Sequence, residues 1–504
     1  MTQIFSSGPS TGGLHLRASD RSLGVNESPD LVNVELTQSG GILKSNGYIR
    51  LNNTALAGAP EIVGVYEYFR ANGDEITLVA AGGNLYELKD DGTWSTLHTG
   101  MTVDAPVAFE TFNDLCIIVN GVDAPLKYDG STVTGLANWT TIESTGYPAY
   151  AEVWKNRLWF TGNPQKPYRV YFSEPGNPEG WDALNGAGAV DVNINDGQLV
   201  TGIKTFFDSL IIYKQRSIHQ LVGDSAPGSG GGNEFRIKPI STDLGCEAPR
   251  TIVTVGNDQF FMGKDHISTI RTTDFFGDVL SQTISFKVQP VFDEMNQNAI
   301  EGAFVVHHRP KNQIWFFYPD GSSAQNNKVL VFDYNLQAWT RREGFMASCG
   351  IALNGKPTVG TYDGNIHKHD FGGNYDGGVI KAHYKTPWYG FNSFPVTKRV
   401  RSIDLSVVRL GDWFVNMHSS WDYQTSSGAF TFNQSPGQRA LWGEALWGFD
   451  VWSGESSGQI RKVSSIGFGK TLQLRFFNNF ADQPFHILGW DILYQSRGIR
   501  PLAR

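Results

Sequence analysis

The stretch FETFNDLCIIV, from Phe109 to Val119, consists of two short hydrophobic runs joined by Asn113 and Asp114. Each run has the length of a strand and is rich in Val, Ile and Phe, and an Asn or Asp between such runs favours a tight turn, so the stretch predicts a β-hairpin. The apolar residues do not follow the 3.6-residue period of a helix. Similar stretches recur along the chain: EVWKNRLWFTG (152–162), KTFFDSLIIYK (204–214), IVTVGNDQFFMG (252–263), HHRPKNQIWFFY (307–318), and weaker copies at 66–80 and 351–361.

The hairpins are regularly spaced. Successive turn residues are separated by roughly 40 to 54 positions, which is the period expected of propeller blades or solenoid units. We expect these residues at the hairpin tips: Asp74, Asp114, Asn156, Asp208, Asp258, Asn312 and Asn354. Several hairpins are followed by a third apolar run, a polar turn and a Trp that we expect to close a fourth strand: Trp94, Trp139, Trp181 and Trp339. This pattern predicts an all-β fold containing a β-propeller of about seven four-stranded blades. A large β-sandwich with coincidental spacing is the alternative.

The pattern divides the chain into three parts. Residues 1–54 are predicted to be an N-terminal arm with closing strands, and residues 55–380 hold the repeats. From residue 381 to 504 the strands become longer and alternate in polarity, as in RVRSIDLSVVRL (399–410), which predicts a C-terminal β-sandwich-like domain.

Composition narrows the possible functions. The net charge is −8, the pI is about 5.8 and the sequence holds no basic run, so tight binding to nucleic-acid phosphates is not expected. Cys116, Cys246 and Cys349 are far apart and show neither metal-binding spacing nor a disulfide framework. The start of the sequence has no apolar signal segment, and no apolar run is long enough to span a membrane, so we expect synthesis in a cytoplasm.

Both ends of the chain resemble a known phage family. The N-terminal residues are Gly24-Val25-Asn26-x-Ser28-Pro29-x-Leu31-Val32-Asn33-Val34, then Gly40-Gly41-Ile42-Leu43-Lys44 and Gly47-Tyr48. The C-terminal residues are Gly489-Trp490-Asp491 and Arg497-Gly498-x-Arg500. Together they resemble the tail hub, or nozzle, proteins of short-tailed bacteriophages, also called packaged-DNA stabilisation proteins. The resemblance implies a propeller-bearing subunit of a six-fold ring below the portal and adaptor. Such a ring lines the channel through which double-stranded DNA leaves and carries fibre, spike or tip proteins.

The sequence predicts no catalytic residue, no cofactor and no metal site. His367 and His369 share one face of a strand, as metal ligands can, but Tyr86 and His219 fill comparable positions, which favours packing. Residues 191–197 are one position out of register with a calcium loop, which favours a strand followed by a turn. Short matches to hydrolase, P-loop and serine-protease motifs lack the required flanking elements and are interpreted as an arm, a hairpin turn and a loop: residues 8–12, 469–471 and 223–225.

The least regular segment contains three tryptophans, Trp442, Trp447 and Trp452, set among glycines. They form either a loop packed on the C-terminal domain or a set of aromatic anchors for a partner, and a sugar-binding platform is a third interpretation. Because Trp is enriched at interaction hot spots, we predict that they contact a partner.

These observations lead to one main hypothesis and two alternatives. The main hypothesis is a structural virion protein of a phage tail, homohexameric and without enzymatic activity, that lines and closes the DNA exit channel. The alternatives are a receptor- or glycan-binding propeller of a tail fibre and a propeller glycoside hydrolase.

Overall fold

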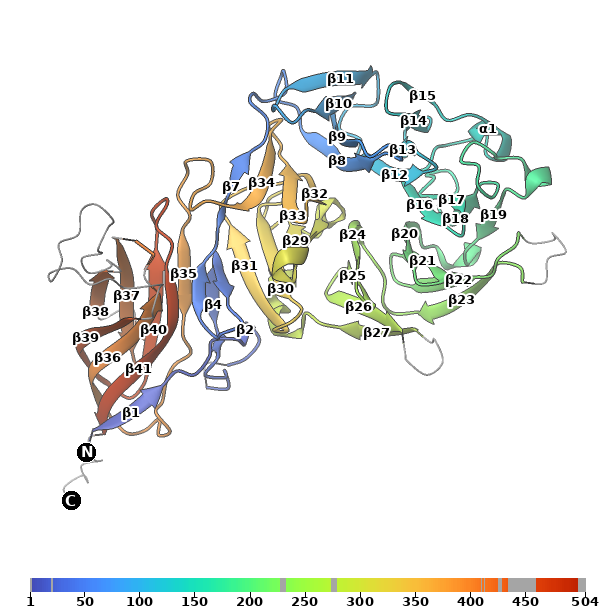
Figure 1. The fold of residues 1–504 in the computed structure, drawn as a ribbon. Helices are drawn as coiled ribbons and strands as arrows, with labels where there is room; N and C mark the ends of the chain where they lie inside the picture. The colour runs from blue at the N-terminus through green and yellow to red at the C-terminus, as the bar shows by residue number, and fades with distance from the viewer. Residues whose placement is uncertain are drawn as a thin grey trace.

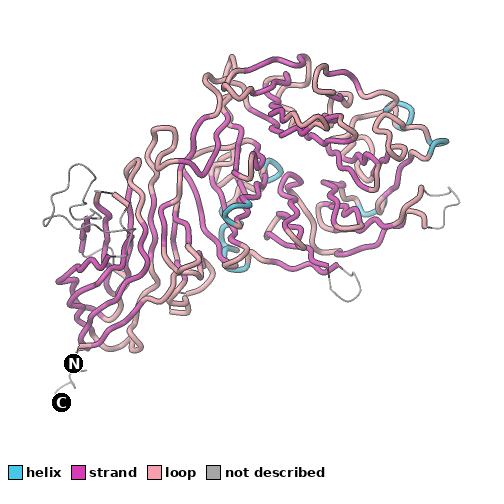
Figure 2. The backbone as a smooth tube through the Cα atoms, viewed as in Figure 1, coloured by secondary structure: helices cyan, strands magenta, loops and turns pink. Residues whose placement is uncertain are grey.

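A computed structural model describes residues 2–19, 21–226, 233–272, 279–408, 410–411, 413–424, 428–433 and 459–496 of the 504-residue chain. Strands account for 51% of the residues and helices for 5%, and Figure 2 shows that the helices are single short turns between strands. They are α1 (Trp139–Ile142), α2 (Pro290–Glu294), η1 (Ala183–Asn185), η2 (Ile194–Asp196), η3 (Phe286–Val288), η4 (Ile300–Gly302) and η5 (Arg309–Lys311).

The middle of the chain folds into consecutive four-stranded antiparallel sheets arranged in a ring (Figure 1). The first three sheets are β8 (Ile62–Phe69), β9 (Glu75–Ala81), β10 (Asn84–Leu88) and β11 (Trp94–Thr99); β12 (Ala108–Phe112), β13 (Leu115–Val119), β14 (Leu126–Tyr128) and β15 (Val133–Gly135); and β16 (Tyr150–Trp154), β17 (Arg157–Thr161), β18 (Arg169–Phe172) and β19 (Gly188–Asp191). The next three are β20 (Val200–Phe206), β21 (Ser209–Lys214), β22 (Ile218–Val222) and β23 (Arg236–Ser241); β24 (Ala248–Val255), β25 (Asp258–Met262), β26 (Ile267–Thr272) and β27 (Val279–Thr283); and β28 (Phe304–His308), β29 (Gln313–Tyr318), β30 (Lys328–Asp333) and β31 (Ala338–Glu343).

The last sheet of the ring combines both ends of the repeat region. Its strands are β32 (Cys349–Leu353), β33 (Lys356–Gly360), β34 (Ile366–Phe371) and the N-terminal β7 (Gly47–Arg50), which pairs antiparallel with β34. The first strand of each sheet packs against the first strand of the next, and β32 packs against β8. This closed cycle of inner strands is the arrangement of a β-propeller, so the predicted fold class is confirmed and a pair of stacked sheets in this region is excluded.

Two further sheets face each other in a sandwich beside the propeller. One contains β39 (Gln459–Gly469), β36 (Lys398–Val408), β41 (His486–Ser496), β6 (Ile42–Lys44) and β5 (Val34–Leu36), with β1 (Gln3–Ser6) also paired to β41. The other contains β38 (Gly428–Asn433), β37 (Phe414–Trp421), β40 (Leu472–Asn478), β35 (Ala382–Lys385) and β4 (Asp30–Val32). Buried and part-buried residues alternate along β37 and β40, which is the two-residue period of a strand with one face in a core. The short strands β2 (Gly13–Leu14) and β3 (Glu27–Ser28) pair in parallel.

The residues of the N-terminal arm divide between the two parts of the molecule. β4, β5 and β6 belong to the sandwich, whereas β7, a few residues later, belongs to the propeller. A continuous apolar cluster crosses the junction, since Leu31 and Val34 pack in the same core as Trp339 of the propeller. The sandwich is therefore built from both ends of the sequence.

The turn residues explain why the hairpins form. Asn113 and Asp114 both have positive φ, 51° and 59°, as a two-residue type I′ turn requires, and Asn and Asp tolerate this conformation better than most side chains. The expected tip positions are confirmed except for Asp258. That residue begins β25, its carboxylate binds Arg271, and Gly256 with φ of 60° forms the turn instead.

The closing tryptophans were only partly placed by the sequence. Trp94 and Trp339 lie in fourth strands, as expected. Trp139 and Trp181 do not, because they lie in α1 and in a loop and pack edge to face with ring centroids 5.1 Å apart. Their indoles fill the core between the sheets of β13 and β17, so burial rather than strand position determines where they sit.

Candidate functional site

The inner wall of the propeller carries charged side chains at equivalent positions. Glu110 of β12, Glu152 of β16 and Lys204 of β20 each stand four residues before a hairpin-tip residue. The backbone N–H of Thr205 donates to Glu152 Oε1 at 2.9 Å, and the backbone N–H of Val153 donates to Glu110 in the same way. Each carboxylate therefore binds the inner strand of the next sheet and holds two neighbouring sheets together.

The two acids differ in their electrostatic environment. Lys204 Nζ lies 2.6 Å from Glu152 Oε2, so Glu152 is neutralised. In the described part of the chain, no Lys, Arg or His nitrogen lies within 4 Å of the Glu110 carboxylate. Burial, with the charge of Glu152 as the second cause, raises the pKa of Glu110 to about 8. Glu110 is accordingly protonated at neutral pH.

One end of the propeller channel is covered by the loop that contains η4. Arg250 Nη2 of β24 and Asn326 Nδ2 both donate to the carbonyl of Gly302, at 2.8 and 2.9 Å, which holds this loop over the inner strands. Two adjoining cavities of about 710 and 450 Å³ lie beneath it and share Tyr150, Asn298 and Glu301 as wall residues. The channel is thus narrowed at this end to pockets of the size that small ligands fill.

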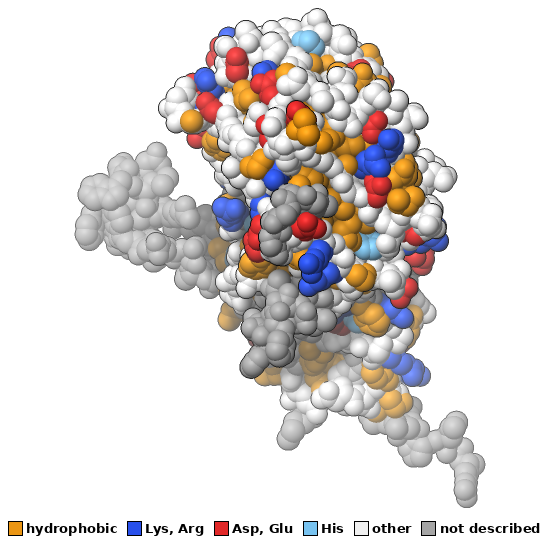
Figure 3. All heavy atoms as spheres, turned by 90° about the vertical axis from the view of Figure 1, so that its right-hand side faces the viewer, with side chains coloured by type: hydrophobic (Ala, Val, Ile, Leu, Met, Phe, Trp, Pro, Cys, Tyr) orange, Lys and Arg blue, Asp and Glu red, His pale blue; other side chains and the backbone are white. Residues whose placement is uncertain are grey.

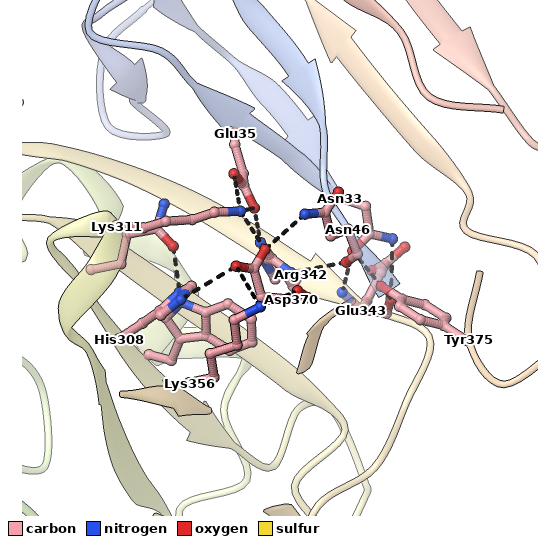
Figure 4. A network of polar contacts seen from close by, with 12 residues as sticks. Asn33, Glu35, Asn46, His308, Lys311, Arg342, Glu343, Lys356, Asp370 and Tyr375 are labelled. Atoms are coloured by element: carbon pink, nitrogen blue, oxygen red, sulfur yellow. Dashed lines mark hydrogen bonds and ion pairs between the residues drawn. The ribbon is translucent and has the colours of Figure 1, made fainter. Parts of the chain in front are cut away.

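The junction between propeller and sandwich is held by a buried ionic network (Figure 4). Glu35 of β5 accepts hydrogen bonds from Lys311 Nζ at 2.9 and 3.0 Å and pairs with Arg342 of β31. Lys311 also reaches Asp370 Oδ1 of β34 at 2.5 Å, and Asn46 Nδ2 reaches the same oxygen at 2.8 Å. The guanidinium of Arg342 lies 4.1 Å above the Trp315 ring, a cation–π contact. Ions from three sheets thus compensate one another where the two domains meet.

Asn33 forms the second part of this junction. Its φ is 53°, and its Nδ2 donates to the carbonyls of Glu343 at 3.1 Å and Lys381 at 2.8 Å. The Tyr375 hydroxyl and the Glu343 N–H donate to Asn33 Oδ1, at 3.2 and 3.0 Å. Asn33 thus adopts the left-handed conformation, and its amide binds both the propeller edge and the segment before β35 (Figure 4). These bonds fix the angle between the two domains.

Two further residues of the N-terminal segment that carries the resemblance have structural roles, Lys44 inside the sandwich and Gly47 at the passage into β7. Lys44 Nζ is buried and donates to Asn478 Oδ1 at 2.8 Å and to the Phe480 carbonyl at 2.7 Å. Burial lowers the pKa of Lys44 to about 8. Gly47 lies so close to the backbone that a Cβ there would stand 1.6 Å from the Asn374 carbonyl oxygen.

The two ends of the chain meet in the sandwich. Ser7 N–H donates to the Trp490 carbonyl at 3.0 Å, and Ser6 Oγ donates to Asp491 Oδ1 at 2.5 Å. Trp490 itself is 3% exposed. Arg497 and Arg500, which also carry the family resemblance, lie outside the described residues.

The paired histidines occupy packing positions. The His367 ring stacks on Tyr48 with centroids 4.2 Å apart, and burial lowers the pKa of His367 to about 4. His369 is fully buried, 4.5 Å from the Phe345 ring centroid, and burial lowers its pKa well below the usual value. Among the residues that the structure describes, no group of three or more His, Cys, Asp or Glu side chains is placed to hold a metal ion.

The remaining motif-like segments have structural explanations. Asp191 pairs with Arg169 at 2.5 Å and Asp196 with Lys214 at 2.7 Å, so protein cations occupy the carboxylates of the calcium-like stretch. Asp224 of the protease-like triplet pairs with Lys155. The P-loop-like residues 469–471 connect β39 and β40, and Asp422 accepts their backbone N–H groups at 2.7 and 2.9 Å.

The predicted partner contacts Trp442, Trp447 and Trp452 lie outside the described residues, so their role stays a prediction. Sequence reasoning did not single out Glu110 and Glu152 as a pair. A signal was present, because both precede a hairpin-tip residue by four positions. The channel-mouth residues Asn298 and Glu301 offered no comparable signal, since the loop that carries them lies between repeats.

No family model and no curated protein matches the sequence. Among solved structures, the chain is similar in fold to virginiamycin B lyase from Staphylococcus aureus, at 13% identity over 65% of this chain and 98% of that one, with a TM-score of 0.41. It is also similar to the WD40 domain of Neurospora crassa Pan2, at 8% identity over 64% and 95%, TM-score 0.41. A third is the computationally designed protein Ika8, at 9% identity over 71% and 98%, TM-score 0.38. In the part of the chain that the structure describes, no helix is long and apolar enough to cross a bilayer.

Proposed function

We propose that the protein is a structural subunit of the tail of a short-tailed bacteriophage, belonging to the hub or nozzle ring below the portal and adaptor. In this proposal the subunits form a closed ring, six-fold as in the family that the chain resembles. The ring encloses the DNA exit channel and holds fibre, spike or tip proteins. The protein acts by assembly and carries out no reaction.

One observation carries the proposal: the residues behind the family resemblance are those that build the two-domain architecture. Asn33 joins the sandwich to the propeller, and Lys44 joins strands within the sandwich. Gly47 allows the close passage into β7, and Trp490 and Asp491 hold the N-terminal strand. The resemblance therefore lies in residues that a propeller joined to such a sandwich needs, rather than scattered over its surface.

The channel of the propeller itself does not serve for DNA in this proposal. The η4 loop covers one end, and Glu110 and Glu152 occupy the wall. DNA would pass instead through the centre of the ring of subunits, where a net charge of −8 per chain favours sliding over tight phosphate binding.

The surface is compatible with extensive contacts between subunits. Charged residues make up only 18% of the chain, and Figure 3 shows Lys, Arg, Asp and Glu side chains scattered among uncharged and apolar ones on the outer face. Leu184, Ile194 and Phe207 are more than half exposed on propeller loops. Apolar side chains left exposed in one subunit become buried when a ring closes.

The experiment is reassembly of tails. Purified protein should have the mass of a closed oligomer by light scattering, alone or on portal–adaptor particles. Added to particles assembled without it, it should restore retention of packaged DNA. A protein that stays monomeric and binds no portal–adaptor particle would refute the proposal.

Replacement of the three tryptophans tests the predicted partner contact in the same reassembly experiment. We expect the triple variant Trp442→Ser, Trp447→Ser, Trp452→Ser to fold but to fail in reassembly. Loss of folding would assign them to a core, and unchanged reassembly would place the contact elsewhere.

A receptor-binding propeller is the second candidate function, and the cavities at the channel mouth favour it specifically. The two functions are compatible, because a tail subunit can both build the ring and contact the host surface.

A further inference from the structure

The cavities at the channel mouth are lined by polar groups that lack protein partners. Within the described ranges, the Tyr150 hydroxyl, the Asn298 side-chain amide and the Glu301 carboxylate make no hydrogen bond or ion pair with the protein. Gln297 Oε1 is buried in the wall without a partner. Tyr150 is half-buried and Asn298 and Glu301 are exposed, so a ligand that enters the cavity can reach all three. Gln297 Oε1 is the buried group of this set, and because buried acceptors are nearly always paired, its lack of a protein partner indicates that a group from outside the protein binds it.

These groups are close enough to influence one another. Burial raises the pKa of Tyr150, the charge of Glu301 raises it further, and the charge of Arg250 lowers it. Arg250 donates one N–H to the Gly302 carbonyl, and no carboxylate of the described chain lies within 4 Å of its guanidinium. Hydrogen-bond donors and acceptors of both neutral and charged type thus converge on one space.

Apolar surface lines the other side of the same space. The rings of Tyr66 and Phe109 stack with centroids 5.5 Å apart and an angle of 11°, and Val65 and Pro249 border them. The Tyr66 hydroxyl is already bonded to Thr111 at 2.9 Å, so Tyr66 offers its ring rather than its oxygen.

The mixture of groups selects the chemical class of the ligand. An anion is disfavoured, because Glu247 and Glu301 both line these cavities and Arg250 is the cationic side chain among their described wall residues. A purely apolar ligand would leave Glu301 and Arg250 desolvated without partners, which is costly. A sugar ring has hydroxyl groups for the carboxylate, amide and guanidinium and a C–H face for the aromatic rings.

We propose that the mouth of the propeller channel is a saccharide-binding site in which Glu301, Arg250, Tyr150 and Asn298 bind sugar hydroxyls and Tyr66 and Phe109 support the ring. The volume of about 710 Å³ accommodates a short oligosaccharide. The proposal is independent of ring assembly, since the site lies within one chain.

The test is calorimetric titration of the full-length protein with defined sugars. The probes are glucose, galactose, N-acetylglucosamine and their linear trisaccharides, each up to about 10 mM, a range that detects even weak sites. Inorganic phosphate is titrated in parallel. We expect at least one saccharide to bind and phosphate not to bind.

Two variants and two matched controls locate the binding. Tyr150→Phe removes only a hydroxyl and should weaken binding about three- to tenfold, and Glu301→Ala should weaken it about ten- to a hundredfold. Tyr147→Phe and Glu294→Ala, which change the same residue types outside the cavity, should leave the affinity within about twofold. Circular dichroism checks that each variant is folded.

Three outcomes would overturn the proposal. The first is no binding of any probe sugar to the folded protein. The second is sugar binding that neither Tyr150→Phe nor Glu301→Ala weakens. The third is binding of phosphate that these variants abolish, which would make the cavity an anion site.

Discussion

Glu110 shows how a single side chain can both stabilise and strain the ring. Its carboxyl group accepts the Val153 N–H of the neighbouring sheet, yet it is buried beside Glu152 with only the more distant Lys204 for compensation. Glu152 makes the equivalent bond to Thr205 but has Lys204 in direct contact. The charge of the Glu152 carboxylate is thus compensated by the Lys204 amine, whereas the Glu110 carboxyl group avoids the charge by keeping its proton.

We predict a pH-dependent gain of stability in Glu110→Gln. The pKa of Glu110 is raised to about 8 in the folded state, so the folded protein holds a proton that the unfolded chain releases near pH 4.5. Wild-type stability should therefore fall as pH rises from 4.5 to 8, whereas Gln keeps the acceptor and cannot ionise. Because a pKa raised from 4.5 to about 8 corresponds to about 1.4 kcal/mol per unit, the variant should be about 3–4 kcal/mol more stable at pH 8 and nearly equal at pH 4.5.

Urea unfolding at half-unit intervals of pH measures this effect. The exposed Glu294→Gln serves as control and should show no such trend. A stability difference for Glu110→Gln that is constant with pH would contradict the assignment of the raised pKa.

Gly47 is the second residue-scale prediction. Its missing side chain allows the chain to pass the Asn374 carbonyl, which a Cβ would approach to 1.6 Å. Gly47→Ala should lower the free energy of unfolding by about 2–4 kcal/mol, because backbone must move to relieve the clash. Gly135→Ala, in a strand where a Cβ meets nothing within 4 Å, should change it by less than about 0.5 kcal/mol. Equal effects of the two substitutions in denaturant melts would show that the close approach is not what constrains Gly47.

At this scale the sequence was informative about turns and weak about sites. The hairpin-tip residues were predictable because Asn and Asp next to strand-like runs favour positive φ, and six of the seven positions behave this way or border the turn. The unpaired groups at the channel mouth were not predictable. These groups lie together because loops distant in the sequence pack against one another, and no local sequence pattern indicates this packing.

At the scale of elements, β7 has the most consequential position. It follows the sandwich strands in sequence but completes the last propeller sheet by pairing with β34, more than 300 residues later. Its N–H and C=O groups are what close the ring, since β34 would otherwise be an unpaired edge.

We predict that breaking this pairing opens the propeller. Leu51 N–H donates to the Ile366 carbonyl at 2.9 Å beside the end of β7. Leu51→Pro removes that bond and should destabilise the protein by about 2–3 kcal/mol more than Leu51→Ala, which removes a similar amount of side chain but keeps the N–H. Hydrogen exchange followed by mass spectrometry should show faster exchange in β34 of the Pro variant. Identical exchange in the two variants would mean that β7 does not hold the ring closed.

The sequence predicted the repeats as elements but not the exchange of strands between domains. The period of the hairpins follows from local sequence patterns, so the propeller could be predicted from the sequence. The pairing of β4 with β35 and of β6 with β41 depends on non-local contacts, which no local pattern specifies. Residues 1–54 were therefore predicted as an arm with closing strands, without the partner strands that the structure gives them.

At the scale of the whole molecule, the wall carboxylates bear on the hydrolase alternative. Glu110 and Glu152 are neighbouring acids on the inner strands, and both are engaged by backbone N–H groups of neighbouring strands. We predict no hydrolysis of bacterial surface polysaccharides or DNA by the pure protein, measured as reducing ends or fragments released. Activity above background that Glu110→Gln or Glu152→Gln removes would contradict this prediction.

The meeting of the two chain ends has a mechanical consequence. β1 and β41 run antiparallel with Gln3 opposite Tyr494, at the end of the sandwich remote from the propeller (Figure 1). A force that separates the termini would first unzip this pair. The chain that follows β1 is bound to the propeller region before it reaches β4, because Leu16 N–H donates to the Lys287 carbonyl at 2.9 Å and Lys287 Nζ lies 3.0 Å from Glu27 Oε1. Tension applied through the N-terminus would therefore pass into the propeller near η3 as soon as β1 had separated, while β41 would still hold the other end of the chain in the sandwich.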